Sequence, residues 1–118
     1  MNRSDFSEAI LKSRELEIAF KGRKTNRTFK ATVWFAQEGE KIYLLPVYGS
    51  DTNWYKNARV NPNLEIIVGG RTVRVKAKFL TEKKPVREVV DRFNERFGAD
   101  EIKKWYSKLD VAVELMLS

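Results

Sequence analysis

The chain contains no cysteine and no histidine among its 118 residues. Their absence excludes disulfides, thiol nucleophiles, imidazole acid or base chemistry, and the usual zinc, copper and haem sites. The sequence also lacks a run of about 18 apolar residues for a membrane span, and its start, Met1 to Asp5, lacks the apolar core of a signal peptide. We therefore expect a cytoplasmic protein whose chemistry is not carried by these side chains.

The composition indicates one small basic domain. The formal charge is +7, and the hydrophobic content of 42 % fits a single core, so we expect one domain over residues 1–118. A charged fraction of 33 % and the single Gln37 are typical of a thermophilic source, whereas seven asparagines point the other way.

Apolar residues that alternate with polar ones predict six strands. The expected strands cover residues 15–20, 27–37, 41–48, 64–68, 71–80 and 111–117. On the second strand Phe29 and Phe35 share the apolar face, while Lys30, Thr32 and Trp34 lie on the other.

Three-four spacing and capping residues predict the helices. Ser4 or Asp5 caps a short helix that ends near Ser13, and a second short helix holds Trp54, Tyr55 and Asn57. A long helix is expected from Thr81, its N-cap, to a stop at Gly98. Another begins at Asp100, and its apolar stripe is Ile102, Trp105, Tyr106 and Leu109.

This order of elements predicts a mainly β, α+β fold: a six-stranded antiparallel barrel with one crossover helix and a C-terminal helical pair. The strand over residues 41–48 is apolar on both faces. Because so short a chain rarely covers both faces alone, this strand predicts a homodimer with a ligand cleft at its seam.

Two segments are candidate anion sites. After strand 41–48, the loop Gly49 to Thr52 leads into a helix whose first N–H groups suit a phosphate. The alternative is a capped crossover helix that plugs the barrel end with Trp54. The segment from Lys21 to Lys30 holds five cations and no acidic residue, and it binds an anion or is simply a solvated loop.

Side-chain catalysis is not expected from this sequence. A Ser-His-Asp or Cys-His arrangement is impossible, and the scattered carboxylates form no recognisable metal or glycosidase pair. A cofactor that itself carries hydride or electrons needs only binding, orientation and dipoles from the protein.

Several motifs together resemble the deazaflavin-dependent nitroreductase family. They are Gly22-Arg23-Lys24-Thr25, then Trp54-Tyr55-Lys56-Asn57 about thirty residues later, and Asn61-Pro62. That family belongs to the flavin-binding split β-barrels, with the pyridoxamine-phosphate oxidases, and the resemblance covers residues 21–117. It implies a homodimeric split barrel that binds an 8-hydroxy-5-deazaflavin coenzyme (F-420 type) or FMN.

The resemblance also implies a set of cofactor-binding residues. Arg23, Lys24 and Thr25 match positions near the cofactor phosphate, and Thr32 matches a position beside the ring. Lys30 matches the second basic residue of this strand, and the alternative alignment puts that residue one position earlier, at Phe29. Tyr48, Gly49 and Ser50 match backbone contacts to the phosphate and chain. Trp54 and Asn57 match residues that close over the ring and side chain.

Some positions depart from the family pattern. Asn26 stands where the family turn commonly has Gly, and Asn tolerates a left-handed backbone. Tyr48-Gly49-Ser50 replaces a Lys-Gly-Gly pattern in a shorter loop, and Thr52-Asn53 replaces Pro-Met before Trp54. The ring type, deazaflavin or FMN, therefore stays open, and a divergent member without cofactor is a further alternative.

The leading hypothesis is a cofactor-dependent oxidoreductase, of nitroreductase or quinone-reductase type, acting on a small organic substrate. Tyr48, Tyr55 and Tyr106 are candidate proton donors, although buried tyrosines are more often structural. The alternative is a binding module without catalysis, either a flavin carrier or an RNA-binding barrel. RNA ranks lower because Phe29 and Phe79 fall on the apolar strand face, away from the cations.

Overall fold

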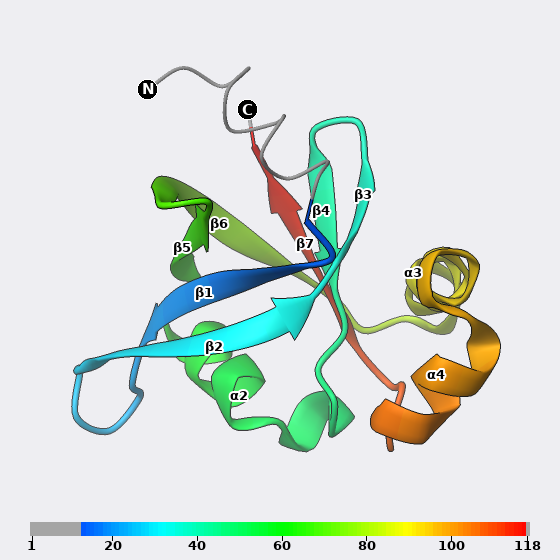
Figure 1. Ribbon diagram of the computed structural model, residues 1–118. Helices are drawn as coiled ribbons and strands as arrows, with labels where there is room; N and C mark the ends of the chain where they lie inside the picture. Colours follow the sequence, from blue (N-terminus) through cyan, green and yellow to red (C-terminus); the bar gives the residue numbers. More distant parts are fainter. Residues whose placement is uncertain (1–12, 118) are drawn as a thin grey trace.

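An antiparallel sheet that curls into a split β-barrel forms the body of the protein (Figure 1). The computed structural model describes residues 13–117, so the short helix expected before Ser13 lies outside the described residues. The strands are β1 (Glu15–Lys21), β2 (Thr28–Trp34), β3 (Ala36–Glu38), β4 (Lys41–Leu44), β5 (Asn63–Val68), β6 (Arg71–Leu80) and β7 (Ala112–Met116). The helices are α2 (Asn53–Val60), α3 (Lys83–Phe97) and α4 (Ala99–Trp105), and a 3-10 turn, η1 (Gly49–Asp51), precedes α2.

One bent segment closes the barrel. The strand order is β2-β1-β5-β6-β7-β4-β3, so β2 and β3 stand at opposite ends of the sheet although they follow each other in the chain. The sequence predicts a single strand over residues 27–37, but the ladder breaks at Phe35. The reason is a change of partner, because Trp34 pairs with Glu15 of β1 whereas Ala36 pairs with Tyr43 of β4.

The inside of the barrel is the first hydrophobic core. Inward side chains of the strands, such as Ile18, Leu44 and Ile66, are fully buried there, and Trp54 and Tyr55 of α2 pack against them. The crossover helix therefore does plug the barrel with Trp54, as one reading of the sequence expects.

A second core lies between the outer face of β3, β4 and β7 and the helices α3 and α4. Tyr43 and Leu45 project outward and are covered by residues such as Phe93 and Ile102. Burying one side chain of this size contributes about 1.5–3 kcal/mol. The inference that strand 41–48 needs a second barrel to cover it is thus wrong, because the chain's own helical pair covers it.

Several element boundaries differ from the expected ones. Strand β4 ends at Leu44 rather than Tyr48. The N-cap of α3 is Glu82 rather than Thr81, because a helix starting one residue earlier would require an N–H that Pro85 lacks, and the first bond is instead from Val86 N to Glu82 O. Helix α4 ends at Trp105, which is 55 % exposed, so the expected apolar stripe reduces to Ile102 and the following Tyr106.

The face assignments of the last strand and the long helix are confirmed. Val111, Val113, Leu115 and Leu117 are all buried in the barrel core, and Gly98 stops α3 with a positive φ of 95°. Among residues 13–117, no helix has the length and apolar character needed to cross a membrane.

Candidate functional site

A groove of about 380 Å³ runs along the edge of β2 that has no strand partner. We call it the aromatic groove. Its lining residues are Ala31, Thr32, Val33, Trp34, Leu45, Val47, Trp54, Trp105 and Tyr106. An edge strand presents unpaired backbone N–H and C=O groups, so this groove combines aromatic walls with a row of backbone hydrogen-bonding groups.

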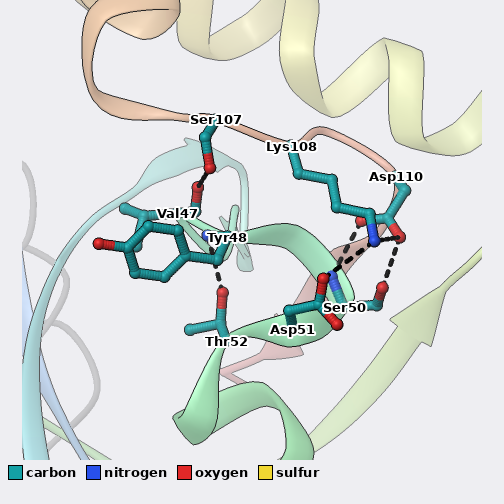
Figure 2. A network of polar contacts seen from close by, with 8 residues as sticks. All are labelled: Val47, Tyr48, Ser50, Asp51, Thr52, Ser107, Lys108 and Asp110. Carbon is teal, nitrogen blue, oxygen red and sulfur yellow. Dashed lines mark hydrogen bonds and ion pairs between the residues drawn. The ribbon is translucent and has the colours of Figure 1, made fainter.

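Two chain segments far apart in sequence form the wall opposite β2. The first runs from Leu45 to Val47, directly after β4. The second consists of Trp105, the last residue of α4, and Tyr106, which follows it. The Ser107 N–H donates to the Val47 carbonyl at 2.9 Å, and the Ser107 hydroxyl donates to the same oxygen at 3.3 Å (Figure 2). A short parallel β-bridge joins Tyr48 to Lys108. These bonds set the distance between the two segments.

Tyr106 is a buried polar group in this wall. Burial raises its pKa, so the hydroxyl stays protonated across the physiological range. Its ring packs against Trp34 and Phe93. Within the part of the chain that the structure describes, no side chain or backbone group hydrogen-bonds the Tyr106 hydroxyl.

The basic turn at residues 22–27 docks onto α2. Asn26 adopts the left-handed conformation, with φ of 59°, and the Gly22 N–H donates to the Arg27 carbonyl at 2.7 Å. Arg23 donates twice to the Asn57 side-chain oxygen, from its backbone N at 3.0 Å and from Nη1 at 2.8 Å. Asn57 lies one helical turn from Trp54, so α2 links the basic turn to the aromatic groove.

Strand β2 makes a second link between the turn and the groove. Thr28, Lys30 and Thr32 alternate along the strand on the face opposite to Ala31 and Val33, which pack against the barrel core. Lys30 therefore stands between the turn and the groove-lining Thr32.

The loop donors after β4 are already engaged within the chain. Ser50 donates to Asp110 twice, from its backbone N to Oδ1 at 2.9 Å and from Oγ to Oδ2 at 2.6 Å (Figure 2). Lys108 Nζ lies 3.1 Å from Asp51 Oδ2 and 3.7 Å from Asp110 Oδ2. We call Ser50, Asp51, Lys108 and Asp110 the loop clamp.

Charges in the loop clamp reinforce one another. Partial burial disfavours the charged form of Asp110, but the hydrogen bonds from Ser50 and the Lys108 charge outweigh it, so the pKa of Asp110 is lowered. The hydrogen bond to Asp51, with the charges of Asp51 and Asp110, raises the pKa of Lys108. The Asp110 carboxylate thus occupies the donors of Ser50 that the sequence suggests for a phosphate.

The predicted site residues fall into three places. Thr32 and Trp54 meet in the aromatic groove, whereas Gly49 and Ser50 belong to the region of the loop clamp, and Tyr48 is exposed with its ring turned away from it (Figure 2). At and near the basic turn are Arg23, Lys24, Thr25, Lys30 and Asn57.

Several residues that line the groove or form the clamp are not predicted from the sequence to belong to a ligand site. Trp34 could have been found, because it shares the outward face of β2 with Thr32. Val47, Trp105 and Asp110 carry no local signal of this kind. Among the described residues, no group of three or more acidic side chains is placed to hold a metal ion.

The fold and the groove at its open edge define a protein of the split β-barrel class. The sequence matches the model of the DUF2255 family over residues 7–113, so the chain belongs to this family, which is described as an uncharacterized protein conserved in bacteria. No curated protein matches the sequence.

Solved structures with the same fold include proteins of different activities. An F420-H2 dependent reductase (FDR-A) has a TM-score of 0.68 and 17 % identity, over 86 % of this chain and 93 % of its own. An FAD-binding protein from Mesorhizobium loti has a TM-score of 0.74 and 13 % identity, over 100 % and 91 %. The haem storage protein HutZ from Vibrio cholerae has a TM-score of 0.74 and 18 % identity, over 98 % and 89 %. At these identities the similarity establishes the fold alone.

Proposed function

We propose that this protein is a cofactor-dependent oxidoreductase that binds a deazaflavin or flavin ring in the aromatic groove. The observation that carries the proposal is the groove itself, which places an unpaired strand edge opposite aromatic side chains and close to a cluster of cations. The F420-H2 dependent reductase and the FAD-binding protein of the same fold support this class of ligand.

The residues present fit such a ring. A volume of about 380 Å³ lies within the range of small-molecule sites. Trp34 and Trp54 offer flat apolar surfaces, and the β2 edge offers backbone donors and acceptors to a polar ring edge.

Haem is a poorer fit, although HutZ and a haem-binding protein from Mycobacterium smegmatis share the fold. The usual protein ligands of haem iron are His and Cys, with Met or Tyr in fewer cases. This chain has neither His nor Cys.

The bound ring would supply hydride transfer to or from a small organic substrate, and a nitro compound or a quinone would be the acceptor in the reducing direction. The protein's part is positioning and electrostatics. Backbone N–H groups of β2 would stabilise negative charge on the ring, and Trp54 would exclude water. The Tyr106 hydroxyl, held protonated by burial, would donate a hydrogen bond to the ligand rather than release a proton.

The cofactor phosphate is assigned to the basic turn, with Arg23, Lys24, Thr25 and Lys30 as its holders. Engagement of Ser50 by Asp110 argues against the alternative place, the loop after β4. Asn57 would act through Arg23, because its side-chain oxygen holds that residue against α2.

A homodimer is part of the proposal. One solved structure of the same fold, at 16 % identity and a TM-score of 0.69, is a domain-swapped dimer. A second copy would cover the exposed Trp105 at the groove mouth, and it would not need the outer face of β4, which α3 and α4 already cover.

The test is titration of ligand-free protein with the F-420 type coenzyme and with FMN, followed by fluorescence, with the mass in solution measured alongside. Lys24→Ala should weaken binding several-fold, because an exposed ion pair with the phosphate contributes about 0.2–1 kcal/mol. The melting temperature should not change, because Lys24 is exposed. Arg23→Ala should weaken binding and also destabilise the fold by about 1 kcal/mol, through the lost bond to Asn57.

Lys84→Ala on α3 is the matched control, since it removes one exposed charge away from the groove. Unchanged affinity in both turn variants would refute the phosphate assignment. Binding without reduction of any nitro compound or quinone by the reduced cofactor would favour the flavin-carrier alternative.

A further inference from the structure

All three tryptophans of the chain line the aromatic groove, but their surroundings differ. Trp54 is only 7 % exposed and belongs to the barrel core, where its ring meets Tyr55 edge-on with the centroids 6.4 Å apart. Little of the Trp54 surface is therefore left for a stacked ligand.

Trp105 is the opposite case. Its ring is 55 % exposed, its Nε1 donates to Glu101 Oε2 at 3.1 Å, and Lys104 Nζ lies 5.3 Å from the ring centroid. Trp105 is thus held by residues of its own helix, α4, and most of its surface faces solvent. It borders the mouth of the groove and offers a ligand no enclosed surface.

Trp34 combines a half-buried ring with an aromatic support. Its ring is stacked on Phe97, with centroids 4.6 Å apart and planes at 20°, and Tyr106 lies 6.2 Å away with its plane tilted by 53°. Because Phe97 covers one face of the indole, the surface that Trp34 gives to the groove belongs to its other face.

Phe97 is itself held in place. It is the last residue of α3 and is 8 % exposed, and the guanidinium carbon of Arg96 lies 5.4 Å from its ring centroid. Arg96 also donates to the Ser13 carbonyl, which ties the end of α3 to the segment before β1. Trp34 is therefore backed by a ring that cannot move aside without disturbing the packing of α3.

We propose that the cofactor ring stacks on the groove-facing side of Trp34, and that this stack favours the oxidised ring over the reduced one. The inference rests on the proposed function, because it needs a deazaflavin or flavin ring in the groove. The oxidised ring is planar and electron-poor, which suits contact with the electron-rich face of an indole. Two-electron reduction adds electron density and makes the ring less planar, so the same contact stabilises the reduced ring less. Trp34 would thereby lower the reduction potential of the bound cofactor, and Phe97 would be a positioning residue that acts through Trp34.

The first experiment replaces each tryptophan in turn by phenylalanine and follows the fluorescence of bound FMN or F-420 type coenzyme. An indole in contact with the excited oxidised ring quenches its fluorescence by donating an electron, and a phenyl ring does not. Trp34→Phe should therefore release the quenching, whereas Trp54→Phe and Trp105→Phe should leave the bound ring quenched. Release by Trp54→Phe or Trp105→Phe alone would move the stack to that residue and overturn the assignment.

The second experiment measures the dissociation constants of the oxidised and the reduced cofactor. Trp34→Leu should lower the preference for the oxidised ring about fivefold, which raises the reduction potential of a two-electron couple by about 20 mV. Phe97→Leu should act in the same direction by a smaller factor, because Trp34 stays but loses its backing. Phe93→Leu is the matched control on α3, since its ring contacts are with Phe97 and Tyr106, and it should leave the preference unaltered.

Unchanged quenching in Trp34→Phe, or an equal effect of Trp34→Leu on the two redox states, would overturn this inference and leave the proposed function standing. Equal changes of the preference in Phe97→Leu and Phe93→Leu would refute the positioning role of Phe97. Failure of the folded wild-type protein to bind either ligand would remove both the proposed function and this inference.

Discussion

At the residue scale, Gly49 stands at a position that has no room for a side chain. Its φ of +56° suits glycine, and a Cβ there would lie 2.1 Å from Asp110 Oδ1 and 3.0 Å from the Lys108 carbonyl oxygen. The close approach of these atoms is what lets Asp110 reach the donors of Ser50.

We predict that Gly49→Ala lowers the free energy of unfolding by about 3 kcal/mol, from left-handed strain together with displacement of the Asp110 carboxylate. Denaturant titration measures this loss. Gly39→Ala is the matched control, because Gly39 has nearly the same φ, +59°, and nothing within 4 Å of the added Cβ. It should cost only the strain, about 1 kcal/mol. Equal losses in the two variants would show that the clash with Asp110 is relieved at no cost.

At the scale of elements, the loop clamp joins the segment after β4 to the segment before β7. These two segments also form one wall of the aromatic groove. The clamp therefore bonds together two segments that border the groove, although none of its members lines the groove.

We predict that Asp110→Asn destabilises the protein by about 1 kcal/mol at pH 7, a value reduced for the exposure of this carboxylate. Because the pKa of Asp110 in the folded protein is lowered below 3.8, its contribution is present above that value and is lost as the pH falls through the folded pKa. The difference in free energy of unfolding between wild type and variant should therefore shrink below about pH 4. Denaturant titrations from pH 7 to pH 2.5 measure it.

The control is Asp91→Asn, on the exposed side of α3. It should show no such pH-dependent difference. A constant difference between wild type and Asp110→Asn down to the lowest pH would mean that the carboxylate charge does not stabilise the clamp.

At the scale of the whole molecule, the two cores share their strands. On β4, Leu44 points into the barrel and Tyr43 points toward α3 and α4. On β7, Val113 and Ala112 divide in the same way. A chain segment that serves both cores cannot leave one without disturbing the other.

We predict that Phe93→Ala destabilises the protein by about 3–5 kcal/mol and that unfolding stays a single transition. Phe93 is fully buried in the helix-covered core. Two single-tryptophan proteins report the two cores separately, one keeping Trp54 in the barrel and the other keeping Trp34 against Phe97. Coincident midpoints in both are expected, whereas an earlier midpoint for Trp34 would show that the helical layer melts by itself.

Burial along most elements was readable from the sequence, because it follows the local period of two or about 3.6 residues. The inward sets of β1 and β7, the face of α3, and the plugging role of Trp54 are all of this kind. The start of α3 is local as well: Pro85 lacks the N–H that the Thr81 cap would require, and the sequence shows this proline.

Contacts between distant segments were decided by the tertiary structure. Ser50 and Asp110 are 60 residues apart, and nothing near either one specifies the other. The break at Phe35 arises because β2 and β3 pair with different strands, and the covering of Tyr43 and Leu45 by α3 and α4 arises from the return of the chain over β4.

The sequence by itself determined that most of the segment 41–48 is covered on both faces, that the turn at residues 22–27 is basic, and that the fold is an antiparallel split barrel. Only the tertiary structure decided what covers that segment and which anion occupies the Ser50 donors. The physical reason is that alternation records whether a side chain is buried, whereas the identity of its partner depends on how the whole chain folds back on itself.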